Sequence, residues 1–189
     1  DRVFNKEEKE LMMEILRKYL DTHKVMERFR KSNEGNAVMK IDDSLTTIQI
    51  LKLLNGLVYP FLSSKNVNKS NLQEDFEKMV LFALLWGVAG MYEQKDRLDF
   101  QELLRTVEPN APLPSIGHNE SLFDYKLKIS DRGVVRRLIE LPQWKPPTKF
   151  AFSQILMPTI DSTRAALQIK LIAEQNKGIM STRSVLFVG

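Results

Sequence analysis

The residues with the clearest potential for chemistry are 184–189, where a run of Val, Leu, Phe and Val ends in a glycine. A continuous apolar run is typical of a strand buried on both faces of a parallel sheet. A glycine directly after such a strand is how a phosphate-binding loop of the form G-x-x-x-x-G-K-[ST] begins. Only the first position of that motif is present, so we expect these residues to come from a longer protein. The alternative is the closing strand of a complete small domain.

Three other features carry residue types associated with chemistry. His23 has no second His at ligand spacing on its helical face, so we expect a packing or solvated histidine rather than a catalytic one. Trp86 lies in an apolar stretch and is predicted to be a core residue before it is a binding platform. A basic cluster is interpreted as the solvated face of a hairpin rather than an anion or nucleic-acid site, because no aromatic residues interleave with it. It comprises Lys126, Lys128, Arg132, Arg136 and Arg137.

The composition argues against several classes of protein. The 189 residues are 43% apolar, enough to bury a core, and contain no cysteine for a disulfide or thiolate metal site. The formal net charge is only +4, with Lys and Arg scattered, so we expect no nucleic-acid partner. The uncharged stretch 79–91 is too short to span a bilayer, so we expect no membrane partner.

Apolar spacing predicts helices up to residue 107. Asn5 and Glu8 form a capping box that opens one long helix through residue 29. A second helix over 44–61 is capped by Asp42 or Asp43 and ended or kinked by Pro60. Its predicted apolar stripe is Leu45, Ile48, Leu51, Leu54, Leu57, Val58 and Phe61.

Two more helices complete this part. The stretch 79–91 is apolar nearly all round, which predicts a helix buried in the middle of a bundle. A short amphipathic helix over 96–107 is predicted to turn four side chains inward, Leu98, Phe100, Leu103 and Leu104.

The amino-acid composition changes after Pro109. Frequent prolines up to residue 149 exclude long helices there. Alternating residues predict a strand over 122–129, a turn at 131–133 and a returning strand over 134–139. Thr159 or Asp161 then caps a helix that ends near 177–178.

Several motifs, taken in chain order, resemble one family. They are Phe-Ala-Leu-Leu-Trp-Gly at 82–87, Arg-Leu-Asp-Phe at 97–100, Leu-Phe-Asp-Tyr at 122–125 and Met-Pro-Thr-Ile-Asp-Ser-Thr-Arg at 157–164. The last is similar to the V-P-T-V-D-T-V-R of dynein heavy chains, with Thr163 where valine is usual. The chain resembles a dynein heavy chain from the lid of the second AAA+ module to the start of the third.

The resemblance implies a mainly α fold in three parts. Residues 1–108 would form the helical AAA+ lid bundle of the second module. Residues 109–153 would form a proline-rich, irregular insert with a β-hairpin. Residues 154–189 would supply the first helix and strand of the α/β AAA+ core of the third module.

The resemblance also implies a nucleotide site. Leu156, Met157, Pro158 and Thr159 would cover the adenine, and Gly189 would open the phosphate loop. ATP or ADP with Mg would bind in the parent motor, whereas these residues hold no complete catalytic site and no metal site of their own. The helix over 44–61 contains no arginine that could sense a phosphate, only Lys52, which agrees with a second module that holds nucleotide structurally.

The overall sequence, including Leu113-Pro114, resembles axonemal dyneins. The resemblance therefore implies an ATP-driven, minus-end-directed microtubule motor of cilia and flagella. The implied location is the cytoskeleton of the axoneme. The implied partners are the rest of the heavy chain ring, dynein intermediate and light chains, and microtubules. The rival interpretation from another class is a stand-alone helical scaffold or adaptor.

Overall fold

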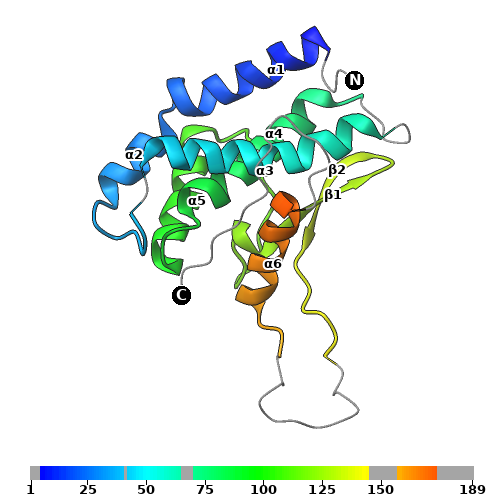
Figure 1. The fold of residues 1–189 in the computed structure, drawn as a ribbon. Helices are drawn as coiled ribbons and strands as arrows, with labels where there is room; N and C mark the ends of the chain where they lie inside the picture. The colour runs from blue at the N-terminus through cyan, green and yellow to red at the C-terminus, as the bar shows by residue number, and fades with distance from the viewer. Residues whose placement is uncertain (1–4, 41, 65–69, 145–156, 174–189) are drawn as a thin grey trace.

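The chain folds as a helical bundle with a two-stranded antiparallel hairpin beside it (Figure 1). The computed structural model describes residues 5–40, 42–64, 70–144 and 157–173. The mainly α fold with a hairpin is therefore confirmed. In chain order the elements are α1 (Lys6–Arg17), the π-helix η1 (Lys18–Thr22), α2 (Val25–Ser32), α3 (Asp43–Ser63), α4 (Leu72–Ala89), α5 (Gln94–Val107), the 3-10 turn η2 (Leu122–Asp124), β1 (Tyr125–Ser130), β2 (Gly133–Leu138) and α6 (Ile160–Ala173).

The first helix begins as predicted but does not continue to residue 29. The Glu8 amide donates to Asn5 Oδ1 at 2.8 Å, and the Asn5 amide donates to Glu8 Oε2 at 2.8 Å. The prediction of one long helix is wrong, because α1 passes into the π-helix η1 and the helix is then interrupted at Lys24, whose φ is 49°. Tyr19 before the break and Phe29 after it both enter the core, where they are 0% and 2% exposed.

Helix α4 lies at the centre of the bundle. Every residue from 79 to 89 is buried, which confirms the predicted buried helix. Its partner is α3, whose Ile50 lies close against Gly87. A Cβ atom on Gly87 would lie 2.5 Å from Ile50 Cγ1, so only glycine allows this spacing.

Helix α3 differs from its predicted stripe in its first half. Leu45, Ile48 and Leu51 are 52%, 39% and 39% exposed, and the buried residues of this half are Thr46 and Ile50 instead. Of the two candidate caps, Asp42 is the one used, since its Oδ1 accepts from the Leu45 amide at 2.7 Å. Pro60 does not end the helix, which continues to Ser63.

Among the described residues, α3 is also the one helix long and apolar enough to cross a membrane by length and composition. Core helices often meet the same criterion, and α3 buries eight side chains in the bundle. The composition of α3 is explained by its packing against α4.

Helix α5 turns a different set of residues inward than the sequence predicts. Phe100 and Leu104 are 0% exposed and Leu103 is half-buried, but Leu98 lies about 200° around the helix from Phe100 and is 39% exposed. A polar residue, Gln101, is buried instead. Its Oε1 accepts from the Leu122 amide at 2.7 Å, which attaches the chain before the hairpin to α5.

The hairpin is anchored to α4 through one buried carboxylate. Asp75 Oδ1 accepts from the Val134 amide at 3.0 Å, and Lys78 Nζ donates to the Val134 carbonyl at 3.2 Å. Gly133 has a φ of 101°, and a Cβ atom there would lie 2.5 Å from Asp75 Oδ2. The first predicted strand starts later than expected, because Ser121 and Asp124 cap the 3-10 turn η2.

Candidate functional site

The predicted adenine-covering segment leads directly into α6. Thr159 is the cap of this helix: its Oγ1 accepts from the Ser162 amide at 3.1 Å, and its own amide donates to Ser162 Oγ at 2.9 Å. The Thr159 carbonyl accepts from the Thr163 hydroxyl at 2.8 Å. The backbone groups of Thr159 are therefore used within the chain, and its hydroxyl hydrogen remains available to a ligand.

The structure places three of the five predicted site residues. Met157 is 67% exposed, Pro158 is half-buried and Thr159 is exposed at the start of α6. Leu156, Gly189 and the predicted strand over 184–188 lie outside the described residues. The three placed residues form a continuous exposed edge with one large apolar side chain, which suits the face of a planar base.

Helix α6 is fastened to the rest of the molecule by an arginine. The Arg164 guanidinium pairs with Asp124 in η2 and donates to Asp161 Oδ1 at 2.8 Å. Asp124 also accepts from the amide and hydroxyl of Ser121 at 2.7 and 2.8 Å. Asp124 and Arg164 both stand in the motifs that carried the family resemblance, but the sequence did not show that they pair with each other.

The electrostatics of this contact favour the ionised carboxylate. Partial burial alone would raise the pKa of Asp124, but hydrogen bonds from Ser121 and Arg164 outweigh it and hold the pKa below its ordinary value. At neutral pH the Asp124 carboxylate is therefore charged and able to hold Arg164.

An aromatic cluster lies beneath this contact. The Trp86 and Phe123 rings meet edge to face at 5.1 Å, and the Arg97 guanidinium carbon lies 5.9 Å from each ring centre. Arg97 Nε donates to the Tyr92 carbonyl at 2.8 Å, and burial lowers the pKa of Arg97. Trp86 is buried, as predicted for a core residue. The cluster joins α4, α5 and η2 into one support for α6.

A polar network joins the π-helix to α4 and to the end of α5. The Tyr19 hydroxyl donates to Glu77 Oε1 at 2.6 Å, and Lys18 Nζ lies 2.9 Å from Glu77 and 2.7 Å from Glu108. Burial alone would lower the pKa of Lys18, but these hydrogen bonds raise it above its ordinary value. His23 Nε2 lies 3.8 Å from Glu108. The His23 ring therefore lies beside this bracing network.

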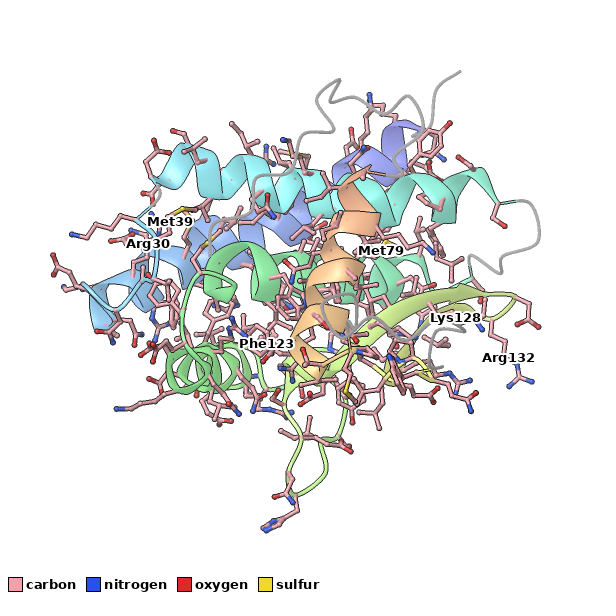
Figure 2. All side chains as sticks on the ribbon, turned by 60° about the horizontal axis from the view of Figure 1, so that its bottom comes forward. Arg30, Met39, Met79, Phe123, Lys128 and Arg132 are labelled. Atoms are coloured by element: carbon pink, nitrogen blue, oxygen red, sulfur yellow. The ribbon has the colours of Figure 1, made fainter. Side chains whose placement is uncertain are left out.

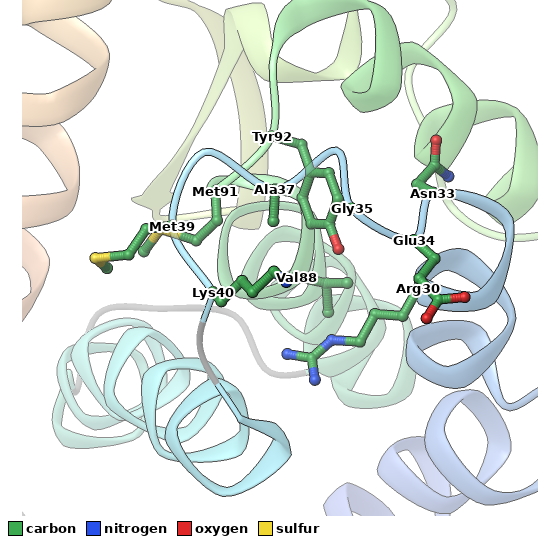
Figure 3. Close-up of a pocket in the computed structure, with 10 residues that line it drawn as sticks. All are labelled: Arg30, Asn33, Glu34, Gly35, Ala37, Met39, Lys40, Val88, Met91 and Tyr92. Carbon is green, nitrogen blue, oxygen red and sulfur yellow. The ribbon is translucent and has the colours of Figure 1, made fainter.

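A cavity of about 220 Å³ lies between the α2–α3 loop and the end of α4 (Figure 3). Figure 3 shows the Arg30 guanidinium and the Tyr92 hydroxyl pointing toward the same space. Arg30 is already paired with Asp43 and Thr46. The sequence analysis did not predict this cavity, because most of its residues lie in the irregular connection from α2 to α3 and form no motif. They are Arg30, Asn33, Glu34, Gly35, Ala37, Met39, Lys40, Val88, Met91 and Tyr92.

Within the described residues, no group of three or more His, Asp or Glu side chains could hold a metal ion.

The geometry defines a class, a helical lid bundle that carries a hairpin and a further helix capped by a Pro-Thr segment. The profile of the family described as "Dynein heavy chain AAA lid domain" matches residues 10–136. This chain therefore belongs to the dynein heavy chain AAA lid family, and the resemblance predicted from the motifs is confirmed.

Curated relatives agree with this assignment. The chain is 27% identical over 150 residues to dynein axonemal heavy chain 8 of Homo sapiens, covering 78% of this chain and 3% of that protein. It is 28% identical over 173 residues to dynein axonemal heavy chain 5 of Mus musculus, which covers 88% of this chain and 4% of that protein. It is 25% identical over 134 residues to the dynein gamma chain of the flagellar outer arm of Chlamydomonas reinhardtii, which covers 69% of this chain and 3% of that protein. The chain thus spans only a few per cent of the length of these relatives.

Proposed function

We propose that this chain is a segment of an axonemal dynein heavy chain, in which the bundle is the lid of one AAA+ module and α6 begins the next. The family match and the names of the relatives support the dynein assignment. The positions of the modules, second for the lid and third for α6, rest on the motif order. The part boundaries at residues 108 and 153 belong to the same proposal.

The observation that carries the proposal is the docking of α6 on the lid. Helix α6 packs against α3, buries Ile172 and holds Asp124 through Arg164. Figure 2 shows α6 lying over the bundle. Because these contacts join the two parts, a rotation of the lid carries α6 and the segment before it as one body. The segment would pass movement from one nucleotide site to the next.

The nucleotide belongs to the proposal as well. A bound ATP or ADP with Mg supplies the free energy of nucleotide binding and phosphate cleavage in the parent motor. Met157 and Pro158 would cover the base, and the Thr159 hydroxyl would donate to its polar rim. Leu156 and Gly189 keep their proposed roles at the base and at the phosphates. The sequence contains no complete catalytic set, so cleavage would rely on residues elsewhere in the motor.

The wider role rests on the family resemblance, and the relatives' names support its axonemal location. We place the parent protein in the axoneme of cilia or flagella, as a minus-end-directed microtubule motor acting with intermediate and light chains. The exposed apolar stripe of Leu45, Ile48 and Leu51 suits packing against the rest of a heavy chain ring.

Two measurements test this function. Reading the transcript beyond Gly189 should complete the G-x-x-x-x-G-K-[ST] loop, and a stop codon there would contradict the proposal. An antibody raised against this chain should label axonemes and detect a protein far larger than 21.9 kDa. A single band at 21.9 kDa would instead support a stand-alone adaptor.

A further inference from the structure

One face of the hairpin is basic. Alternate residues of a strand share a face, and the register places Lys126 opposite Arg137 and Lys128 opposite Val135. Lys126, Lys128 and Arg137 therefore lie on one side, and Arg132 adds a fourth cation at the turn. Figure 2 shows Lys128 and Arg132 at the end of the hairpin that projects from the bundle. We call these four residues the basic face.

The basic face is not neutralised by the described structure. None of its four cations forms an ion pair with a described residue, and Lys128, Arg132 and Arg137 are exposed. Arg136 on the opposite face behaves differently. It lies in the field of Glu74 and Tyr19, and burial lowers its pKa to about 10. The hairpin thus separates Arg136, which is half-buried, from the basic face.

The strand register places two like charges opposite each other. Lys126 and Arg137 are directly paired across the strands, and this repulsion lowers the stability of the hairpin. Asp131 at the turn is the one acidic residue in 125–138. A like-charge pair that no described acidic residue neutralises points to a function, because proteins keep such unfavourable pairs at functional sites. Here the function would be binding a negatively charged partner.

The backbone of β1 offers that partner an edge. The Ile139 amide donates to the Asp124 carbonyl at 2.7 Å, so alternate residues counted from Asp124 bond to β2. Leu127 and Ile129 then direct their backbone groups away from β2, and no described residue forms a hydrogen bond with them. Val134, on the other edge, is already held by α4. Lys126 and Lys128 stand beside the open edge, roughly 7 Å apart.

We propose that the basic face binds an acidic, extended polypeptide segment that adds along β1. Alternate Glu or Asp side chains of such a segment repeat at the spacing of Lys126 and Lys128. A nucleic acid is the weaker fit, because the face carries no aromatic side chain on which bases could stack. This proposal does not depend on the proposed dynein function.

The test uses the whole 189-residue chain and a fluorescein-labelled peptide of alternating Glu and Thr, followed by fluorescence anisotropy. Saturable binding that weakens with salt is expected. The double variant Lys126→Glu with Lys128→Glu should weaken binding at least about tenfold. The matched control is Lys9→Glu with Arg28→Glu, which changes the charge equally on exposed helical positions and should keep binding within about twofold.

A second readout separates binding from structure. Lys126→Glu alone replaces a like-charge pair by an opposite-charge pair with Arg137, so it should raise Tm by roughly 1–3 °C while it weakens peptide binding. If the lysines serve only to keep a strand edge from aggregating, the peptide will not bind and the proposal fails. Equal weakening in the control variant would also overturn it. So would an oligonucleotide of matched charge that binds as tightly and responds equally to the double variant.

Discussion

Helices α4 and α6 are held in place by different forces. All residues from 79 to 89 of α4 are buried, whereas α6 buries only Ile172 fully and depends on the Arg164–Asp124 pair. Apolar burial is strong and insensitive to pH and salt, while a partly exposed ion pair is weaker and sensitive to both. The bundle is therefore the stable scaffold, and α6 is an attachment that can be broken while the scaffold stays folded.

The largest effect should follow from damage to the scaffold. Phe76 is 0% exposed and meets Phe61 edge to face at 6.2 Å. Phe76→Ala should lower the free energy of unfolding by about 3–5 kcal/mol, through lost burial and the cavity left behind. Thermal unfolding followed by circular dichroism measures this. Leu98→Ala, at a half-exposed position, should cost less than about 1 kcal/mol, and an equal loss would show that α4 is not the scaffold.

A smaller effect is expected where the hairpin meets the scaffold. Gly133→Ala must adopt a φ of 101° and place a Cβ atom 2.5 Å from Asp75 Oδ2, so it should cost about 2–3 kcal/mol. Gly35→Ala is the matched control, since its φ is 87° but no atom lies within 4 Å. It should cost about 1–2 kcal/mol. Equal losses in urea titrations would show that contact with Asp75 does not require glycine.

The attachment of α6 should respond to the loss of one charge. Asp124→Asn removes the partner of Arg164 and should weaken docking by about 1–2 kcal/mol, with little change in unfolding of the bundle. Limited trypsin digestion should then cut faster after Arg164. Asp161→Asn is the control, because that carboxylate is 77% exposed and its pair with Arg164 contributes little.

The smallest effect is a dependence on acidity. The pKa of Asp124 is lowered in the folded chain, so its contribution is complete above the ordinary value of 3.8 and is lost as pH falls through the folded value. Trypsin is inactive there, so pepsin digestion within the acidic range is the suitable probe, with Asp124→Asn digested at each pH to account for the pH dependence of pepsin itself. The wild-type chain should release α6 as the pH falls below 3.8, whereas the release of α6 in Asp124→Asn should depend less on pH.

The sequence was sufficient for features governed by local rules. The capping box of Asn5 and Glu8, the buried helix around Trp86 and the hairpin turn follow from spacing and turn chemistry. Features set by tertiary packing were missed. The break at Lys24 interrupts a continuous apolar spacing that by itself predicts one helix, and the exposure of Leu45 depends on which part of α3 the bundle covers.

The candidate site shows the same limit. The capping role of Thr159 was one of two alternatives offered by sequence, and the structure selects it. The pairing of Asp124 with Arg164 joins residues 40 positions apart, which no local pattern could reveal. The roles of Met157, Pro158 and Thr159 at a base stay predictions.

Hydrogen exchange of the 189-residue chain, read for α6 and α4 in the same sample, tests most directly whether the lid carries α6 as one body. Protection of α6 amides in the wild-type chain, lost in Asp124→Asn while α4 stays protected, is the predicted result. Exchange of α6 at the rate of an unfolded peptide in the wild-type chain would contradict it.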